Sequence, residues 1–250
     1  KFNSVREFVG IPFGQSPTGS NRFRPSKPAR PFGKQIFMAI HDQPPCPQIE
    51  AGIFVNEDCL HLSVYSPSRY RIGTRELPVI FWIFGGAFIV GGGWTNGLYS
   101  GAQLISEMDA VFVTFNYRVG TFGFLCTSGD NGISGNAGIT DQILAFEWVR
   151  KHIGAFGGDA NNITIQGQSA GALSVMILLQ YLPISQYVKR AIIMSCPLGL
   201  RFKSKYEASQ IGDDFLAEFN CSPQDLSCIQ NIPVIQILRK QKSIANILRS

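Results

Sequence analysis

The stretch NITIQGQSAGALSV, residues 162–175, carries the most specific pattern in this chain. An apolar run at 162–166 has the composition of a buried strand, and it stops at Gly-Gln-Ser-Ala-Gly. A second apolar run, with helical character, begins directly after the serine. A strand, a very tight turn and a helix in this order form a nucleophile elbow, which holds a serine above the end of a sheet. The pattern therefore predicts that Ser169 is a nucleophile.

Gly167 and Gly171 flank this serine in a G-x-S-x-G pattern. A β-carbon at either position is expected to collide with the neighbouring strand or helix, so glycine is required there. The backbone N–H of Ala170 is expected to point toward the space beside the hydroxyl, at the positive end of the helix. The alternative interpretation of Ser169 is a helix-capping serine in an ordinary turn.

A second Gly-rich turn lies in FWIFGGAFIVGGG, residues 81–93, directly after another apolar run. The N–H groups of Gly86 and Ala87 are expected to converge with that of Ala170 and to form an oxyanion hole. The alternative is a purely structural glycine turn. A phosphate cradle is disfavoured because no Gly-Lys-Ser/Thr follows and the G-x-G-x-x-G spacing is absent.

Strands and helices are predicted to alternate along the middle of the chain. Four strands are expected to be buried on both faces, because their apolar residues continue without polar alternation: 78–84, 110–117, 162–166 and 190–196. Helices are expected at 102–108, after Ser169 up to Pro183, and over 137–153 with a stripe of Ile139, Ile143, Phe146, Val149 and Ile153. This alternation predicts an α/β fold with a mainly parallel sheet and helices on both faces.

The two ends of the chain have different patterns. Residues 1–70 are rich in Pro and Gly, and we expect loops and antiparallel edge strands there, with one strand at 60–65. Residues 205–250 are predicted to form a helical cap within the same domain, with apolar positions at Ile211, Phe215, Leu216, Phe219, Val234, Ile235, Leu238 and Ile244. The chain starts without Met or an apolar signal core and ends inside an apolar-periodic stretch, so we expect a longer parent protein.

Composition excludes several classes of protein. The chain is 45% hydrophobic and 16% charged, which favours a compact globular protein. No apolar window approaches the ~18 residues that a membrane span needs. The net charge of +5 is spread along the chain, and the densest basic stretch, residues 22–34, is interleaved with prolines, so a nucleic-acid partner is not expected.

The six cysteines show no C-x-x-C and no His at zinc spacing, so neither a metal nor a cofactor is expected. Two possible pairs, Cys46 with Cys59 and Cys221 with Cys228, would close short polar loops, which suits an oxidising compartment. The alternative is six reduced, buried cysteines in a cytosolic enzyme. The sequons Asn162-Ile-Thr and Asn220-Cys-Ser are consistent with a secreted glycoprotein.

The sequence resembles the type B carboxylesterase and cholinesterase-like family of α/β-hydrolases over nearly all of residues 1–200. The motifs that carry this resemblance are VREFVGIPFG, NRFRPSKP, NEDCLHLSVY, PVIFWIFGGAF, FNYRVGTFGFL, GNAGITDQILAFEWVRKHIGAFGGD and NITIQGQSAGA. The resemblance implies that Ser169 accepts the acyl group and that Gly86, Ala87 and Ala170 supply the oxyanion hole. It implies a carboxylic ester hydrolase that acts on small-molecule esters. The alternative is a non-catalytic cholinesterase-like adhesion or storage protein, although such relatives often lose the nucleophile.

The resemblance also implies contacts away from the elbow. It pairs Cys46 with Cys59 and Cys221 with Cys228, and it leaves Cys126 and Cys196 without counterparts. It further implies two structural ion pairs, Arg22 with Glu57 and Arg118 with Asp141.

The sequence departs from the family in two places that bear on substrate choice. Gln168 stands where the family usually has Glu, and the loop between Cys46 and Cys59 contains no Trp. Attraction for cationic substrates is therefore expected to be weak, and choline esters are not expected.

The triad that would activate Ser169 is incomplete in these residues. Its partners follow the serine in the order acid then His in α/β-hydrolases, yet His41, His61 and His152 all precede it. The later carboxylates, in the helical segment, are not assigned a catalytic role: Asp213, Asp214, Glu218 and Asp225. Because the family is roughly twice this length, we interpret the chain as an N-terminal half whose missing C-terminal half supplies the acid and the His.

Overall fold

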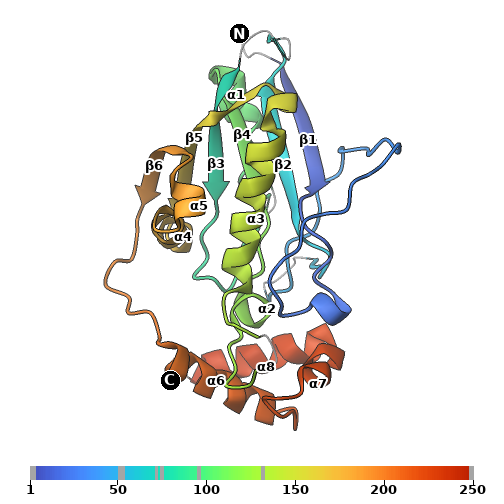
Figure 1. Cartoon of the computed structure of the whole chain (residues 1–250), viewed down its shortest axis with the longest axis vertical. Helices are drawn as coiled ribbons and strands as arrows, with labels where there is room; N and C mark the ends of the chain where they lie inside the picture. The colour runs from blue at the N-terminus through green and yellow to red at the C-terminus, as the bar shows by residue number, and fades with distance from the viewer. Residues whose placement is uncertain are drawn as a thin grey trace.

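The computed structural model describes residues 4–49, 54–70, 73, 76–94, 97–130 and 133–247, with side chains up to Ser243. One mixed sheet, in the strand order β1-β2-β4-β3-β5-β6, runs through this part of the chain (Figure 1). The strands are β1 (Val5–Pro12), β2 (His61–Pro67), β3 (Leu77–Ile83), β4 (Val111–Phe115), β5 (Gly158–Gln168) and β6 (Val188–Met194).

The sheet has an antiparallel part and a parallel part. β1 and β2 are antiparallel to each other, and β2 is antiparallel to β4. β4, β3, β5 and β6 are all parallel to their neighbours. The predicted edge arrangement in the N-terminal residues and the mainly parallel sheet are both confirmed. The carboxyl ends of β3 and β5 therefore meet at one edge of the sheet, where the functional residues were predicted.

Helices cover both faces of the sheet, as predicted. α3 (Ala137–His152), α4 (Ala170–Leu179) and α5 (Leu182–Ser185) contribute to the large core, which also contains Phe81 and Phe115. α1 (Ala102–Glu107) lies on the other face, where Ile105 packs with Tyr65, Trp82 and Phe112. α2 (Gly120–Phe124) follows β4 at the lower end of the sheet in Figure 1. The apolar runs of the sequence thus form two cores, separated by the sheet.

The predictions for β6 and for the end of α4 are wrong in detail. β6 is not buried on both faces: Ile192 and Ile193 are 44% and 42% exposed, because β6 is the edge strand of the described sheet. α4 ends at Leu179, before Pro183, which lies in the first turn of α5, where its missing N–H costs nothing.

The buried face of α3 also includes polar residues that the apolar stripe did not indicate. Ile139 and Ile143 are only half-buried, whereas Asp141 and Gln142 are fully buried. Asp141 pairs with Arg118, and the Gln142 side-chain amide donates to the Ser174 hydroxyl at 3.1 Å. The predicted apolar stripe is confirmed, because Phe146, Val149 and Ile153 lie in the core and Ile139 and Ile143 pack against it. The helix buries the two polar side chains in addition to this stripe.

The C-terminal helices form a second packed layer, seen at the bottom of Figure 1. α6 (Lys205–Ala217) begins with a capping box formed by Ser204 and Glu207, and α7 (Leu226–Asn231) and α8 (Val234–Ile247) follow it. Their apolar residues pack with Phe23 and Phe122 in a separate cluster. Two predicted core positions instead face outward, since Ile211 is 46% and Ile235 is 51% exposed. The predicted role of Ile244 concerns a side chain outside the described residues.

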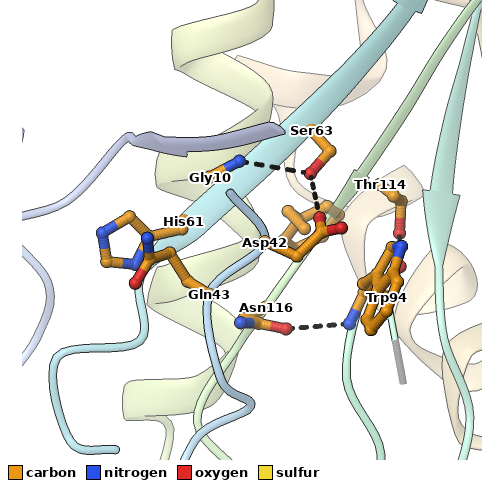
Figure 2. Close-up of a pocket in the computed structure, with 10 residues that line it drawn as sticks. Gly10, Asp42, Gln43, His61, Ser63, Trp94, Thr114 and Asn116 are labelled. Atoms are coloured by element: carbon orange, nitrogen blue, oxygen red, sulfur yellow. Dashed lines mark hydrogen bonds between the residues drawn. The ribbon is translucent and has the colours of Figure 1, made fainter. Parts of the chain in front are cut away.

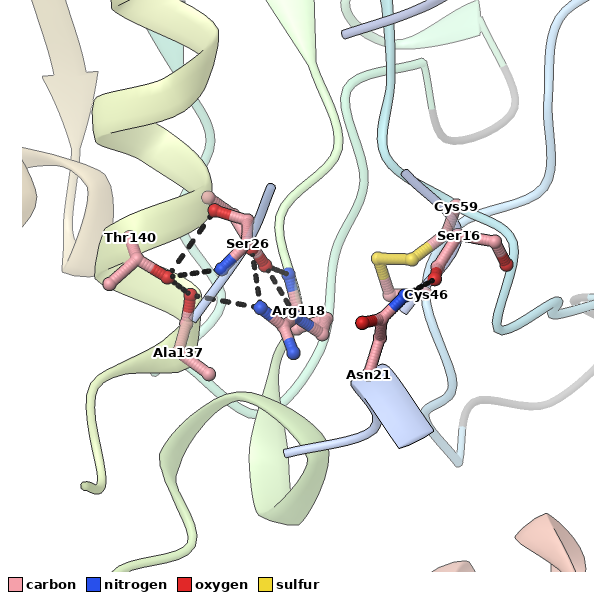
Figure 3. A network of polar contacts seen from close by, with 9 residues as sticks. Ser16, Asn21, Ser26, Cys46, Cys59, Arg118, Ala137 and Thr140 are labelled. Atoms are coloured by element: carbon pink, nitrogen blue, oxygen red, sulfur yellow. Dashed lines mark hydrogen bonds and ion pairs between the residues drawn. A yellow bond between two sulfur atoms is a disulfide. The ribbon is translucent and has the colours of Figure 1, made fainter. Parts of the chain in front are cut away.

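The structure confirms the covalent and ionic contacts that the resemblance implied. Disulfides join Cys46 to Cys59 and Cys221 to Cys228, and Cys126 and Cys196 are free. Two ion pairs form at 2.6 Å and 2.7 Å, between Arg22 and Glu57 and between Arg118 and Asp141. Figure 3 shows Arg118 beside Ala137 on α3, near the contact of Ser26 with Thr140 and to one side of the Cys46–Cys59 disulfide.

Candidate active site

Ser169 occupies the predicted turn between β5 and α4. Its backbone has φ 56° and ψ −120°, a conformation that a residue with a side chain adopts only under strain. Its N–H donates to the carbonyl of Met194 on β6 at 2.9 Å, and its carbonyl accepts from Leu173 at 3.1 Å. The Ser169 side chain makes no capping hydrogen bond to α4 in the described structure. The helix-capping interpretation is therefore not supported, and the hydroxyl is not used to hold the turn.

The two glycines of the elbow are required by close backbone contacts. A β-carbon at Gly167 would lie 2.3 Å from the carbonyl oxygen of Gly171. A β-carbon at Gly171 would lie 2.1 Å from the carbonyl oxygen of Ile83, at the end of β3. Both distances are far below van der Waals contact, so the predicted collisions are confirmed. The strained serine is therefore held between close backbone contacts on both sides.

The Gly-rich turn after β3 lies directly against the elbow. β3 and β5 are neighbours, and Ile83 is paired with Gly167 in their register. A β-carbon on Gly85 would approach the Ser169 Cβ to 3.1 Å and the Gln168 carbonyl oxygen to 2.5 Å. The Gly-rich turn and the elbow, which are more than 80 residues apart in the sequence, therefore meet at Ser169. The sequence pattern predicted that these two turns would converge.

The turn itself has an unusual backbone. Gly86, Ala87 and Phe88 have successive positive φ values of 121°, 55° and 59°. The carbonyl of Gly86 accepts from the N–H groups of Ile89 and Val90 at 2.9 Å and 3.1 Å, so it is directed into the loop. Turns of this kind can direct consecutive N–H groups to one side, which favours an anion there. Ala87 is exposed, Gly86 and Ser169 are half-buried, and Ala170 is buried at the start of α4.

The described histidines do not lie near the serine. His61 is on β2, which β4 and β3 separate from β5, so it is about 14 Å away across the sheet. His152 ends α3 beside the amino end of β5, roughly 30 Å from the elbow along an 11-residue strand. His41 is exposed in the loop before Cys46. Burial lowers the pKa of both His61 and His152, but neither histidine is placed to take a proton from Ser169.

The later carboxylates have structural partners. Asp213 accepts from the N–H of Ser128 at 3.1 Å, Asp225 caps α7, and Glu218 pairs with Lys240. Asp214 is exposed on α6. These contacts agree with leaving the carboxylates out of the candidate triad.

A small polar pocket lies on another part of the sheet, between β1, β2 and β4 (Figure 2). Its lining includes Asp42, which accepts a hydrogen bond from Ser63 at 3.3 Å. Burial raises the pKa of Asp42, while the hydrogen bond from Ser63 acts in the opposite direction. β4 and β3 separate β2 from β5, so the pocket is distinct from the elbow.

Sequence reasoning missed the side chains that hold the Gly-rich turn from behind. Gln48, Thr114 and Asn116 are all buried and form hydrogen bonds to the backbone of Gly91 or Gly93. Residues 21 to 43 positions apart make these bonds, so no local spacing pattern marks them. The one available signal was that Gln48 lies two positions after Cys46, close to a predicted disulfide.

Comparison with known proteins agrees with this geometry. The family model described as "Carboxylesterase family" matches residues 1–249. The chain belongs to the carboxylesterase family. Among curated relatives, the bile salt-activated lipase of Bos taurus is 35% identical over 226 residues, covering 84% of this chain and 36% of the relative. The para-nitrobenzyl esterase of Bacillus subtilis is 33% identical over 246 residues, which cover 95% of this chain and 49% of the esterase.

Solved structures of esterases share the fold. A thermophilic "PNB esterase" superposes with a TM-score of 0.90 at 31% identity, and the match covers 100% of this chain and 52% of the esterase chain. A carboxylesterase of Geobacillus stearothermophilus gives a TM-score of 0.87 at 35% identity, and the match covers 96% of this chain and 50% of that carboxylesterase. The α/β-hydrolase fold predicted from the sequence is confirmed. The chain spans less than half the length of these curated relatives and about half of these solved structures.

No helix among the described residues is both long and apolar enough to cross a bilayer.

Proposed function

We propose that the full-length protein is a carboxylic ester hydrolase in which Ser169 is the nucleophile. The strained conformation of Ser169 beside the Gly-rich turn supports this proposal most directly, because the backbone holds a hydroxyl that no cap uses. Strain of this kind persists at a site only when the surrounding structure holds it in place, and such sites are often functional. Membership of the carboxylesterase family supports the same reaction class.

The proposed reaction proceeds through an acyl-enzyme. The Ser169 oxygen attacks the ester carbonyl carbon, and its proton passes to a histidine that acts as general base. The carbonyl oxygen becomes an oxyanion, which the N–H groups of Gly86, Ala87 and Ala170 stabilise. The histidine returns the proton to the leaving alcohol as the carbon–oxygen bond breaks. Water then attacks the acyl-enzyme in the same way and releases the acid and the free serine.

The residues in hand supply only part of this machinery. No described histidine lies near Ser169, so we propose that a C-terminal segment of the full-length protein supplies both the acid and the His. The length of the relatives supports this, since the chain covers 36% to 49% of them. The exposed outer edge of β6 is consistent with further chain packing there. We also propose that residues 205–250 form a cap segment within the same domain.

Labelling with a fluorophosphonate tests the proposed function. This probe forms a covalent bond only with an activated serine, so the full-length protein is expected to be labelled and its Ser169→Ala variant is not. Absence of label on correctly folded full-length protein would favour a non-catalytic adhesion or storage protein. The name of one relative, a "Crystal protein" of Dictyostelium discoideum that is 35% identical over 245 residues, leaves that alternative in view.

A second prediction concerns residues 1–250 expressed alone. We expect this fragment to hydrolyse p-nitrophenyl acetate no faster than its own Ser169→Ala variant, because none of its described histidines is placed to remove the serine proton. The measurement is the rate of p-nitrophenolate release at equal concentrations of the two proteins. A clear excess in the unsubstituted fragment would contradict the proposal that the triad partners lie elsewhere.

Substrate class and location follow as further parts of the proposal. Gln168 beside the nucleophile carries no charge, so we propose neutral small-molecule esters as substrates and disfavour choline esters. The two disulfides support passage through the secretory pathway. Asn220 is the better glycosylation candidate because it is exposed, whereas the side chain of half-buried Asn162 accepts a hydrogen bond from Arg190.

A further inference from the structure

Gln48 forms a two-way hydrogen-bonded contact with the backbone of Gly91. Its side-chain oxygen accepts from the Gly91 N–H at 2.6 Å, and its side-chain nitrogen donates to the Gly91 carbonyl at 2.7 Å. The same nitrogen donates to the Cys46 carbonyl at 3.0 Å. Only 3% of Gln48 is exposed, so water does not compete well for these bonds. One side chain thus satisfies both polar groups of one residue of the loop, as a neighbouring strand would.

Two more buried side chains hold the same loop at Gly93. The Thr114 hydroxyl donates to the Gly93 carbonyl at 2.6 Å, and the Asn116 side-chain oxygen accepts from the Gly93 N–H at 2.8 Å. The Asn116 nitrogen also donates to the Pro44 carbonyl at 3.1 Å. Figure 2 shows Thr114 and Asn116 beside this part of the loop. Residues 44–48, which include the disulfide-bonded Cys46, are therefore joined to the loop at two points.

The contacts at Gly91 lead directly to the serine. Gly91 has φ 117°, and a β-carbon there would lie 2.7 Å from the carbonyl oxygen of Gly85. Gly85 in turn lies against Ser169 and Gln168, as described above. A movement of Gly91 would therefore displace Gly85, and with it the N–H groups of the two residues that follow.

The loop needs such external support because its own backbone is strained. Ala87 and Phe88 both have side chains and positive φ values, a conformation that is unfavourable for residues other than glycine. Within the loop, the Gly86 carbonyl accepts from Ile89 and Val90, which closes one turn but does not attach it to the sheet.

We propose that Gln48 is a positioning residue of the active site. By holding Gly91 it sets the positions of the Gly86 and Ala87 N–H groups relative to the Ser169 hydroxyl. Gln48 does not touch the reacting atoms and acts only through the loop. This inference rests on the proposed function, because the loop matters for catalysis only if it stabilises an oxyanion.

The test compares Gln48→Met with Gln230→Met in the full-length protein. Methionine keeps the volume and removes the hydrogen bonds. Gln230 is the matched control, since its side chain also donates to two backbone carbonyls, those of Ser20 and Arg22, but joins α7 to the N-terminal segment. Rates are expressed per active site, as titrated with a fluorophosphonate, so that unfolded protein does not count.

Gln48→Met is expected to lower kcat for p-nitrophenyl acetate by about tenfold or more, with KM changed by less than about twofold. A displaced N–H donor stabilises the oxyanion of the transition state less well, whereas it contributes little to binding of the neutral ester. A trifluoromethyl ketone, which forms an oxyanion on the serine, is expected to bind more weakly by a similar factor. Gln230→Met is expected to leave both values unchanged. If Gln48 had only a structural role, its replacement would lower the melting temperature without changing kcat per active site or the affinity for the ketone.

A second pair of variants covers the case in which Gln48→Met does not fold. Thr114→Val removes only the hydroxyl that holds Gly93 and is expected to weaken ketone binding, whereas Thr114→Ser keeps a hydroxyl and is expected to restore it. Unchanged kcat and ketone affinity in Gln48→Met would overturn the positioning role but not the proposed function. If Gln48→Met is unfolded, the same result in Thr114→Val would do so. If the unsubstituted protein shows no hydrolysis that depends on Ser169, the proposed function fails and the positioning role fails with it.

Discussion

Replacing Asp141 by asparagine is expected to lower the free energy of unfolding by about 3–5 kcal/mol. The Asp141 carboxylate accepts from Arg118 at three donors, the side-chain Nε at 2.8 Å, the side-chain Nη2 at 2.7 Å and the backbone N–H at 3.0 Å. The two side chains are only 2% and 0% exposed. The substitution leaves the Arg118 guanidinium buried without a counter-charge, and this uncompensated charge accounts for the cost.

Urea unfolding of the full-length protein measures this effect. The matched control is Glu218→Gln, which removes the carboxylate of an ion pair with Lys240 whose side chains are 31% and 49% exposed. That change is expected to cost no more than about 1 kcal/mol, because water screens an exposed pair. Equal losses in the two variants would contradict the importance we attach to burial at Arg118 and Asp141.

Replacing Gly171 by alanine is expected to reduce esterase activity by about a hundredfold or more. The new β-carbon would lie 2.1 Å from the carbonyl oxygen of Ile83 and 2.8 Å from that of Phe84. Both are backbone atoms of the segment that leads into the Gly-rich turn, so no side chain can move aside. The start of α4 has to shift by about 1 Å, and a misplacement of that size at a catalytic group can cost about 10²-fold in rate.

The measurement is kcat/KM for p-nitrophenyl acetate, compared with that of Gly154→Ala. Gly154 provides a fair control because nothing lies within 4 Å of the position of its β-carbon. Its replacement is expected to leave the rate unchanged. Retention of full activity by Gly171→Ala would mean that the elbow tolerates displacement, and the tight contact between β3 and α4 would then have no catalytic role.

Much of the candidate site could be predicted because its signals are local. The Gly-x-Ser-x-Gly pattern and the glycines after β3 are short sequence patterns, and the strand before each turn appears as an apolar run. Parallel strands bring their carboxyl ends to one edge, so the two turns were expected to meet there. The disulfides and ion pairs were predicted from the family resemblance, because residue spacing in one sequence does not identify contacts between distant segments.

Burial was predicted less well, because it depends on what covers each element. β6 has the apolar composition of a central strand, yet Ile192 and Ile193 are exposed because β6 is the edge strand of the described sheet. Asp141 and Gln142 have the composition of a solvent-facing helix surface, yet both are buried, where Asp141 pairs with Arg118 and Gln142 donates to Ser174.

By itself, the sequence determined the order of strands and helices and the positions of the two glycine turns, since these follow from periodicity and from short glycine patterns. Only the tertiary structure decided that Ser169 lies against Gly85 and that Gln48, Thr114 and Asn116 hold the same loop at Gly91 and Gly93. Hydrogen bonds between distant segments depend on how the whole chain packs, and a buried amide can satisfy any backbone group that packing brings to it.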